Sequence, residues 1–71
     1  MSFAKWLRQF EGEKSPVGDL AGDIKRDKEF PKTRGHKGMR EYLEERNACE
    51  ECLNAFELAW EKYTKEVERN E

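Results

Sequence analysis

Two carboxylates, Asp23 and Asp27, lie one helical turn apart in a stretch whose pattern predicts the end of an amphipathic helix. A carboxylate pair at this spacing can share a proton or bind a cation. In the alternative, structural interpretation, Asp23 pairs with Lys25, Arg26 or a base on another helix. Asp27 then accepts backbone N–H groups in the turn that ends at Pro31. Because carboxylates commonly serve turns and caps, we expect Asp23, Asp27 and Pro31 to be parts of a structural turn.

Two cysteines, Cys49 and Cys52, form a C-x-x-C pattern that is compatible with zinc binding or redox chemistry. A structural zinc ion needs four ligands, and besides the thiols the chain offers only His36 and carboxylates. Redox use of the thioredoxin type needs a βαβ setting, which the sequence does not predict. We therefore expect both thiols to pack, with Cys49 on the apolar stripe of a helix and Cys52 near the edge of that stripe.

Three further side chains invite a chemical interpretation. His36 lies between glycines in a basic stretch without an evident acid or nucleophile beside it, so we expect a solvated loop residue. Trp60 and Tyr63 resemble a ligand-stacking pair, but their place on an apolar stripe favours core anchors. The sequence thus predicts no catalytic residue, no metal site and no cofactor, and the protein is expected not to be an enzyme.

Charge is unevenly distributed along the chain, although the net charge is only -2. Residues 25–40 carry seven bases and two acids, whereas residues 41–71 carry four bases and ten acids. A basic loop that contains glycine and precedes a helix can hold a phosphate or an acidic partner. The side chains of this candidate interaction surface are Lys32, Arg34, His36, Lys37 and Arg40.

Several features disfavour duplex DNA as the partner of this basic segment. The sequence pI is about 5.5, and Glu41, Glu44 and Glu45 would repel phosphates from the third predicted helix. The gap before that helix is also longer than the turn of a helix-turn-helix motif. We therefore favour a protein partner or self-association, through the basic 25–40 segment, the acidic last helix or both. Nucleic-acid association through the loop from Lys32 to Arg40 is the alternative.

Apolar residues recur at helical spacing and predict four helices. The first spans about residues 3–11 behind Ser2, and the second begins at Ser15-Pro16 and ends near Lys28. The third starts near Gly38, after the basic loop. The predicted core comprises Phe3, Trp6, Leu7, Phe10, Leu20, Ile24, Phe30, Tyr42, Leu43, Leu53, Phe56, Trp60 and Tyr63.

The boundary between the third and fourth helices is less evident. Apolar residues seven positions apart, from Tyr42 onwards, would permit one continuous helix. Two features favour a break: Arg46 falls where an apolar residue is expected, and Asn47 followed by Glu50 resembles a capping box. The fourth helix then carries an apolar stripe from Cys49 to Val67.

With 71 residues, the chain is expected to be one all-α domain over residues 1–71, with a frayed tail at about 68–71. The sequence shows no signal peptide and no membrane span. Two cysteines without a secretory signal indicate a reducing cytoplasm.

The order and spacing of these motifs resemble the YozE family, small cytoplasmic proteins of Gram-positive bacteria and their phages. The matching residues are Phe3, Trp6-Leu7, Phe10, Pro16, Leu20-Ala21, Asp23-Ile24, Asp27, Phe30-Pro31, Tyr42-Leu43-Glu44, Phe56, Ala59-Trp60 and Tyr63. The resemblance implies a sterile-alpha-motif-like bundle of four or five short helices, with the third and fourth separate. It implies no established activity and no catalytic residues. Gly22 and the Cys49/Cys52 pair are not features of the family pattern.

Overall fold

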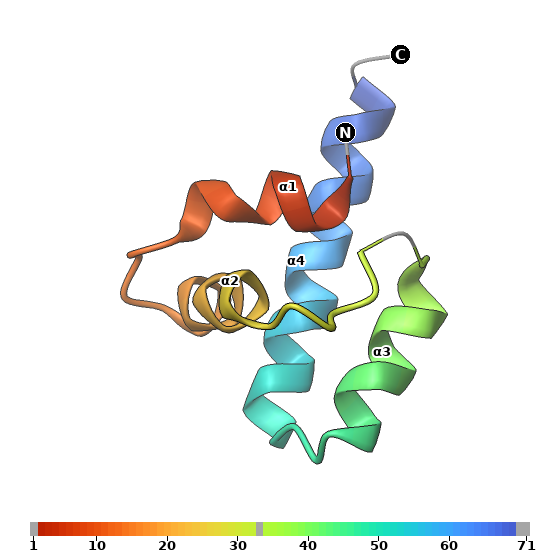
Figure 1. Ribbon diagram of the computed structural model, residues 1–71. Coiled ribbons are helices and arrows are strands. Elements are labelled where there is room, and N and C mark those ends of the chain that lie inside the picture. The colour runs from red at the N-terminus through yellow and green to blue at the C-terminus, as the bar shows by residue number, and fades with distance from the viewer. Residues whose placement is uncertain (1, 33, 70–71) are drawn as a thin grey trace.

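The computed structural model describes residues 2–32 and 34–69, and within these ranges the chain is all-α. The elements are α1 (Phe3–Leu7), the 3-10 turn η1 (Arg8–Phe10), α2 (Pro16–Arg26), α3 (His36–Glu45) and α4 (Glu50–Arg69). Figure 1 shows α4 as the long helix of the bundle, with α1 crossing it near one end and α3 running back beside it. Helix α4 contacts all three other α-helices, so it is the common support of the fold.

Helix α1 is short because its last turn tightens into η1. Ser2 caps its start, with the side-chain oxygen accepting a hydrogen bond from Lys5 N at 3.2 Å. The chain then reverses at Gly12, whose φ of +83° is a conformation that suits glycine. The prediction of one helix over 3–11 is correct for its first part and wrong for the 3-10 turn that completes it.

Helix α2 begins where its cap chemistry predicts. Ser15 Oγ accepts from Gly18 N at 3.0 Å, and Pro16 occupies the first helical position. A Cβ at position 18 would lie 2.0 Å from the backbone oxygen of Glu13, so only glycine lets the α1–α2 connection lie against this turn. The helix ends at Arg26, two residues before the predicted end, because Asp27 is already extended, with ψ of 100°.

Helix α3 begins at His36, two residues before the predicted start at Gly38. Gly35 is the extended residue that precedes it. The basic stretch is therefore only partly a loop, because its second half forms the first turn of α3. Thr33, in the same predicted loop, lies outside the described residues.

The break between α3 and α4 is as predicted, but its cause differs. Asn47 has a φ of +58°, and its N–H bonds to Glu44 O at 3.0 Å while Ala48 N–H bonds to Leu43 O at 3.0 Å. This is the Schellman arrangement that ends a helix, with Asn47 in the left-handed position. The predicted capping box of Asn47 and Glu50 is therefore wrong, because Asn47 closes α3 instead of opening α4.

One core runs between the helices. The buried apolar residues are Phe3, Ala4, Trp6, Leu7, Val17, Leu20, Ala21, Ile24, Phe30, Met39, Leu43, Ala55, Phe56 and Ala59. The half-buried residues Phe10, Tyr42, Leu53, Trp60 and Tyr63 pack against this cluster. All thirteen predicted core residues thus lie in or against it. Val67, at the end of the predicted stripe, is 37% exposed.

Helix α4 ends at Arg69. The frayed tail expected at about 68–71 stays a prediction. Residues 70 and 71 lie outside the described part of the chain. Glu66, one turn before the end of the helix, accepts a hydrogen bond from the Trp6 indole N–H and so ties α4 to α1.

Candidate interaction surface

The structure divides the five predicted surface residues into two groups. His36 belongs to the first group, because its Nε2 lies 2.8 Å from both carboxylate oxygens of Glu57 on α4. Its ring also stacks on Phe56, with centroids 5.3 Å apart and planes at 26°. The prediction of a solvated loop histidine is therefore wrong. The earlier start of α3 turns this ring towards α4.

Arg40 joins the same contact from one helical turn further along α3. Its Nη1 donates to Glu57 Oε2 at 2.7 Å, and its Nε lies 3.9 Å from Glu44. The hydrogen bond from Arg40, aided by His36, lowers the pKa of Glu57 below its usual value. Two of the five predicted surface side chains, His36 and Arg40, are thus bound to a carboxylate of the same chain.

The other three residues, Lys32, Arg34 and Lys37, are exposed. None of them forms an ion pair with a described residue, and the same holds for exposed Lys28. They lie on the connection between α2 and α3 and on the first turn of α3. This group of unpaired cations is the part of the predicted surface that remains available to a partner.

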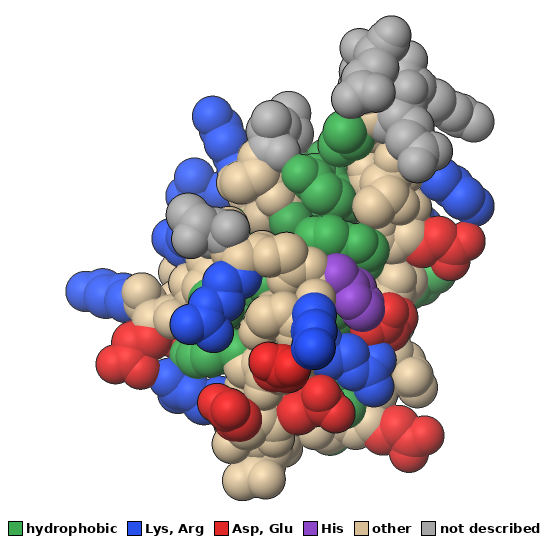
Figure 2. Space-filling model, turned by 90° about the vertical axis from the view of Figure 1, so that its right-hand side faces the viewer, with side chains coloured by type: hydrophobic (Ala, Val, Ile, Leu, Met, Phe, Trp, Pro, Cys, Tyr) green, Lys and Arg blue, Asp and Glu red, His purple; other side chains and the backbone are tan. Residues whose placement is uncertain are grey.

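Figure 2 shows the face that contains α3. The single histidine lies at the surface, with hydrophobic side chains above it and a mixed group of basic and acidic side chains below it. Because the basic and acidic groups alternate here, this face is not uniformly basic. On α3, Arg40 is paired with Glu57, and just after α3 Arg46 is paired with Glu29.

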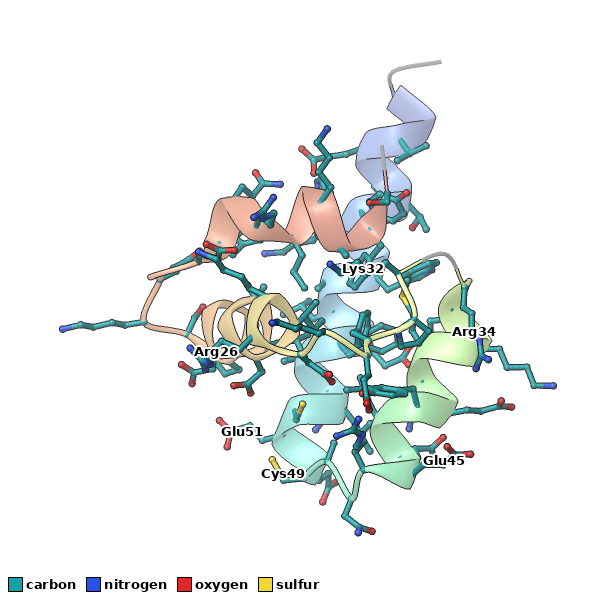
Figure 3. All side chains as sticks on the ribbon, in the orientation of Figure 1. Arg26, Lys32, Arg34, Glu45, Cys49 and Glu51 are labelled. Atoms are coloured by element: carbon teal, nitrogen blue, oxygen red, sulfur yellow. The ribbon has the colours of Figure 1, made fainter. Side chains whose placement is uncertain are left out.

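Unpaired acids gather at the opposite end of α3. Glu45 ends the helix, and Glu50 and Glu51 begin α4. All three are exposed, and no ion pair joins them to a described base. Figure 3 shows Arg34 near the start of α3 and Glu45 near its end, whereas Glu51 lies on the first turn of α4, on the side away from α3. The unpaired bases thus lie around the start of α3, and the unpaired acids lie at its end and on the first turn of α4.

Asp23 and Asp27 have different partners and do not act as a pair. Asp23 Oδ1 accepts from Arg26 at 2.9 Å on the surface. Asp27 Oδ1 accepts from Glu29 N at 3.0 Å, and its Oδ2 accepts from the Tyr42 hydroxyl at 2.6 Å. The Tyr42 hydrogen bond, followed by the Glu29 N–H, lowers the pKa of Asp27. The carboxylate therefore fixes the turn after α2 to α3.

Phe30 and Pro31 complete this turn. Phe30 is 4% exposed and meets the Tyr42 ring edge-on, with centroids 5.6 Å apart. Half-buried Pro31 follows it, and the carbonyl of Phe30 accepts from Lys32 N at 2.8 Å. Burial, followed by the hydrogen bond to Asp27, raises the pKa of Tyr42 above its usual value. The turn thus positions both Lys32 and the start of α3.

The cysteines are placed differently from the prediction. Cys49 is exposed and precedes α4, so its assignment to the apolar stripe is wrong. Cys52 is half-buried and packs against the core. Both thiols are free, and burial raises the pKa of Cys52. Within residues 2–32 and 34–69, no three His, Cys, Asp or Glu side chains are grouped so as to hold a metal ion.

A family model described as the YozE SAM-like fold matches residues 2–65. The chain belongs to the YozE family. Comparisons with curated proteins and with solved structures give no match. The description of the YozE family names a fold and no activity. Membership in this family therefore does not by itself assign a biochemical role to the chain.

For this YozE-family chain, the described helices include none that is long and apolar enough to cross a lipid bilayer.

The residues that sequence reasoning missed are mainly the carboxylates that accept hydrogen bonds from distant side chains. Glu57 holds His36 and Arg40, and Glu66 holds the Trp6 indole. Both glutamates lie on α4, which carries several other glutamates. No sequence signal therefore distinguishes these two from their neighbours.

Proposed function

We propose that this YozE-family chain is a non-enzymatic protein-interaction module that associates with copies of itself, head to tail. The basic surface comprises Lys32, Arg34 and Lys37, and the acidic surface comprises Glu45, Glu50 and Glu51. The observation that carries the proposal is that these charges remain unpaired and separate, the bases around the start of α3 and the acids at its end and on the first turn of α4 (Figure 3), whereas His36, Arg40 and Arg46 are paired.

The two surfaces differ from each other, and this determines the kind of assembly. A contact between unlike surfaces leaves one free basic surface and one free acidic surface in every pair. Such a contact produces rings or open chains of molecules rather than a two-fold dimer. Complementary charge mainly accelerates encounter and sets orientation, so we expect association that weakens as salt is added.

Support for a non-enzymatic role comes from the polar groups themselves. The carboxylates of Asp27 and Glu57 are occupied by contacts that hold helices and turns together. The imidazole of His36 is likewise bound to Glu57 and stacked on Phe56. These are structural uses of the residue types that would otherwise be considered for acid–base catalysis.

Sedimentation velocity tests the self-association over a range of protein concentrations. At about 10 mM salt the Debye length is about 30 Å, and at about 1 M it is about 3 Å. We expect the average mass to rise with concentration at low salt and to fall to that of one chain at high salt. A single chain mass at every concentration at low salt would overturn the proposal.

Charge reversal identifies the surfaces. Arg34→Glu/Lys37→Glu removes the basic surface, and Glu50→Lys/Glu51→Lys removes the acidic one. Each variant alone should remain a single chain. A mixture of the two should associate again, because the intact acidic surface of the first variant meets the intact basic surface of the second, and the two reversed surfaces are also of opposite sign. Pairing within either variant alone would contradict a head-to-tail contact.

The alternative is association with nucleic acid through the loop from Lys32 to Arg40. The unpaired cations Lys28, Lys32, Arg34 and Lys37 favour it, whereas the commitment of Arg40 to Glu57 weakens it. Phosphate contacts make binding strongly dependent on salt. A mobility shift of single-stranded or duplex nucleic acid at about 10 mM salt, lost in Arg34→Glu/Lys37→Glu, would favour this alternative. No shift would eliminate it.

A further inference from the structure

A groove of about 210 Å³ lies between α1 and the second half of α2, on the side where the α2–α3 connection passes. Ala4, Ala21 and Ile24 line its apolar part, and all three are buried. Figure 3 shows Lys32 on the connection, where it passes close to α1 and α2. Three separate segments of the chain therefore contribute to this groove.

Four cations surround the groove, namely Lys5, Arg8, Lys25 and Lys32. Lys5 lies on α1, Arg8 begins η1, and Lys25 lies in the last turn of α2. Folding thus collects positive charges that are far apart in the sequence. The charge pattern of the sequence does not indicate this group, because Lys25 and Lys32 belong to the basic 25–40 segment whereas Lys5 and Arg8 precede it.

Glu11 is the acid that contacts this group. Its carboxylate lies 3.7 Å from Arg8 Nε and 3.3 Å from Lys25 Nζ. Its Oε1 is buried and accepts no hydrogen bond among the described residues. Lys5 and Lys32 have no ion pair with a described acid. Four cationic side chains therefore line the groove, and Glu11, which is not among the lining residues, pairs with two of them.

We propose that this groove binds a phosphate group. A phosphate carries nearly two negative charges and several acceptor oxygens, so it can be shared among cations that approach from different sides. A carboxylate carries one charge and has fewer positions for such donors. Ala4, Ala21 and Ile24 give the groove an apolar part, against which an organic group attached to the phosphate would pack. The ligand class is therefore phosphate or a small phosphomonoester.

This site is independent of the proposed self-association. Lys5, Arg8 and Lys25 belong to neither of the surfaces assigned to it, and only Lys32 belongs to both. A test that leaves Lys32 unchanged therefore examines the groove alone. Either proposal can fail without the other.

Amide chemical shifts in two-dimensional NMR provide the test, with inorganic phosphate and phenyl phosphate titrated at constant ionic strength. We expect saturable shifts in the amides of residues 4–8 and 21–25. Phenyl phosphate should bind more tightly than inorganic phosphate if its ring contacts the apolar part of the groove. The two probes should bind equally tightly if only the phosphate group is bound. Absence of saturable shifts with both probes would overturn the proposal.

Two double variants of equal charge separate a specific site from general screening. Lys5→Gln/Lys25→Gln removes two groove cations and should weaken phosphate binding about tenfold or more, because one tenfold step corresponds to only about 1.4 kcal/mol. Lys14→Gln/Lys62→Gln removes two exposed cations outside the groove and should leave binding unchanged. Equal weakening in the two variants would contradict a phosphate site in the groove. Circular dichroism establishes that both variants are folded.

Discussion

Helices α1 and α3 are attached to the same α4 by different means. Four of the five residues of α1 are buried, whereas α3 buries only Met39 and Leu43 among its ten residues. Side chains of α1 join an aromatic cluster with side chains of α4. The cluster comprises Phe3, Trp6, Phe10, Phe56, Trp60 and Tyr63. Helix α1 is therefore held mainly by apolar contact.

Helix α3 depends more on polar contacts along its length. His36 and Arg40 bind Glu57 near its start, Tyr42 binds Asp27 in its middle, and Arg46 donates to Glu29 at its end at 2.6 Å. Apolar burial is little affected by salt, whereas exposed ion pairs are screened. Sensitivity to salt and pH should therefore be concentrated at α3.

The largest expected effect lies in the aromatic cluster. Phe3 is 2% exposed and its ring centroid lies 4.8 Å from that of Trp60. Phe3→Ala should reduce the free energy of unfolding by about 3–5 kcal/mol. A domain of this size has only about 4–10 kcal/mol in total, so thermal unfolding followed by circular dichroism should show a melting temperature lowered by about 4–8 °C for each kcal/mol lost. Lys62→Ala, at an exposed position, should unfold like the wild type. A stable Phe3→Ala domain would mean that burial does not hold α1.

A second substitution tests the end of α3. Asn47 adopts a left-handed conformation with a φ of +58°. This conformation is unfavourable for most residues other than glycine, asparagine and aspartate. Asn47→Ala should cost about 1–2 kcal/mol, whereas Asn47→Gly should retain or raise stability because glycine adopts this conformation freely. Denaturant titration measures both variants. Equal stability of the two variants would show that this turn is not what ends α3.

The polar attachment of α3 is tested by Glu57→Gln, which keeps the size of the side chain but removes its charge. The melting temperature should fall at low salt, because Arg40 and His36 lose their anionic partner. The difference from the wild type should shrink towards 1 M salt, where the Debye length is about 3 Å. Glu61→Gln, which breaks only the exposed contact with Lys65, should have less effect at any salt. If the melting temperatures of both variants depended on salt in the same way, polar contacts with Glu57 would not be what attaches α3 to α4.

The smallest effect is expected from Tyr42→Phe, which removes one hydroxyl and keeps the ring beside Phe30 and Arg46. The folded-state pKa of Asp27 is lowered, so its contribution is present above its unfolded pKa of about 3.9 and is lost as pH falls. The folded-state pKa of Tyr42 is raised, so its contribution is present below about pH 10 and is lost at higher pH. The wild type should therefore be more stable than the variant between about pH 4 and 10 and approach it outside that window. A difference that does not vary with pH would exclude the hydrogen bond to Asp27 as its cause.

The fold could be predicted well where the signal is local. Ser15 and Pro16 mark the start of α2 because a cap acts within one turn. The start of α3 could not be predicted, because the contacts of His36 lie 21 positions away at Glu57. Asn47 shows a different kind of ambiguity. Asparagine serves both at the beginning and at the end of helices, and only the backbone conformation reveals which end it closes.

The candidate site could be predicted as a list of charges but not as a surface. Sequence analysis identified Arg34 and Lys37 together with Arg40, and the structure leaves the first two exposed while Arg40 binds Glu57. Which cation is neutralised depends on which acid the folded chain brings within reach. The same reason explains why the groove between α1 and α2 could not be predicted. Lys5 and Lys25 become neighbours only when α1 packs on α2.

The hydrogen bond from Trp6 to Glu66 joins residues 60 positions apart. Contacts of such large sequence separation form late, because the whole intervening chain must be ordered or closed into a loop first. Helices α3 and α4 meet across a much shorter stretch, so we expect their hairpin to form early and α1 to dock last. During synthesis, α1 leaves the ribosome before α2, α3 and α4, and it must therefore wait until Glu66 has been made before it finds its place.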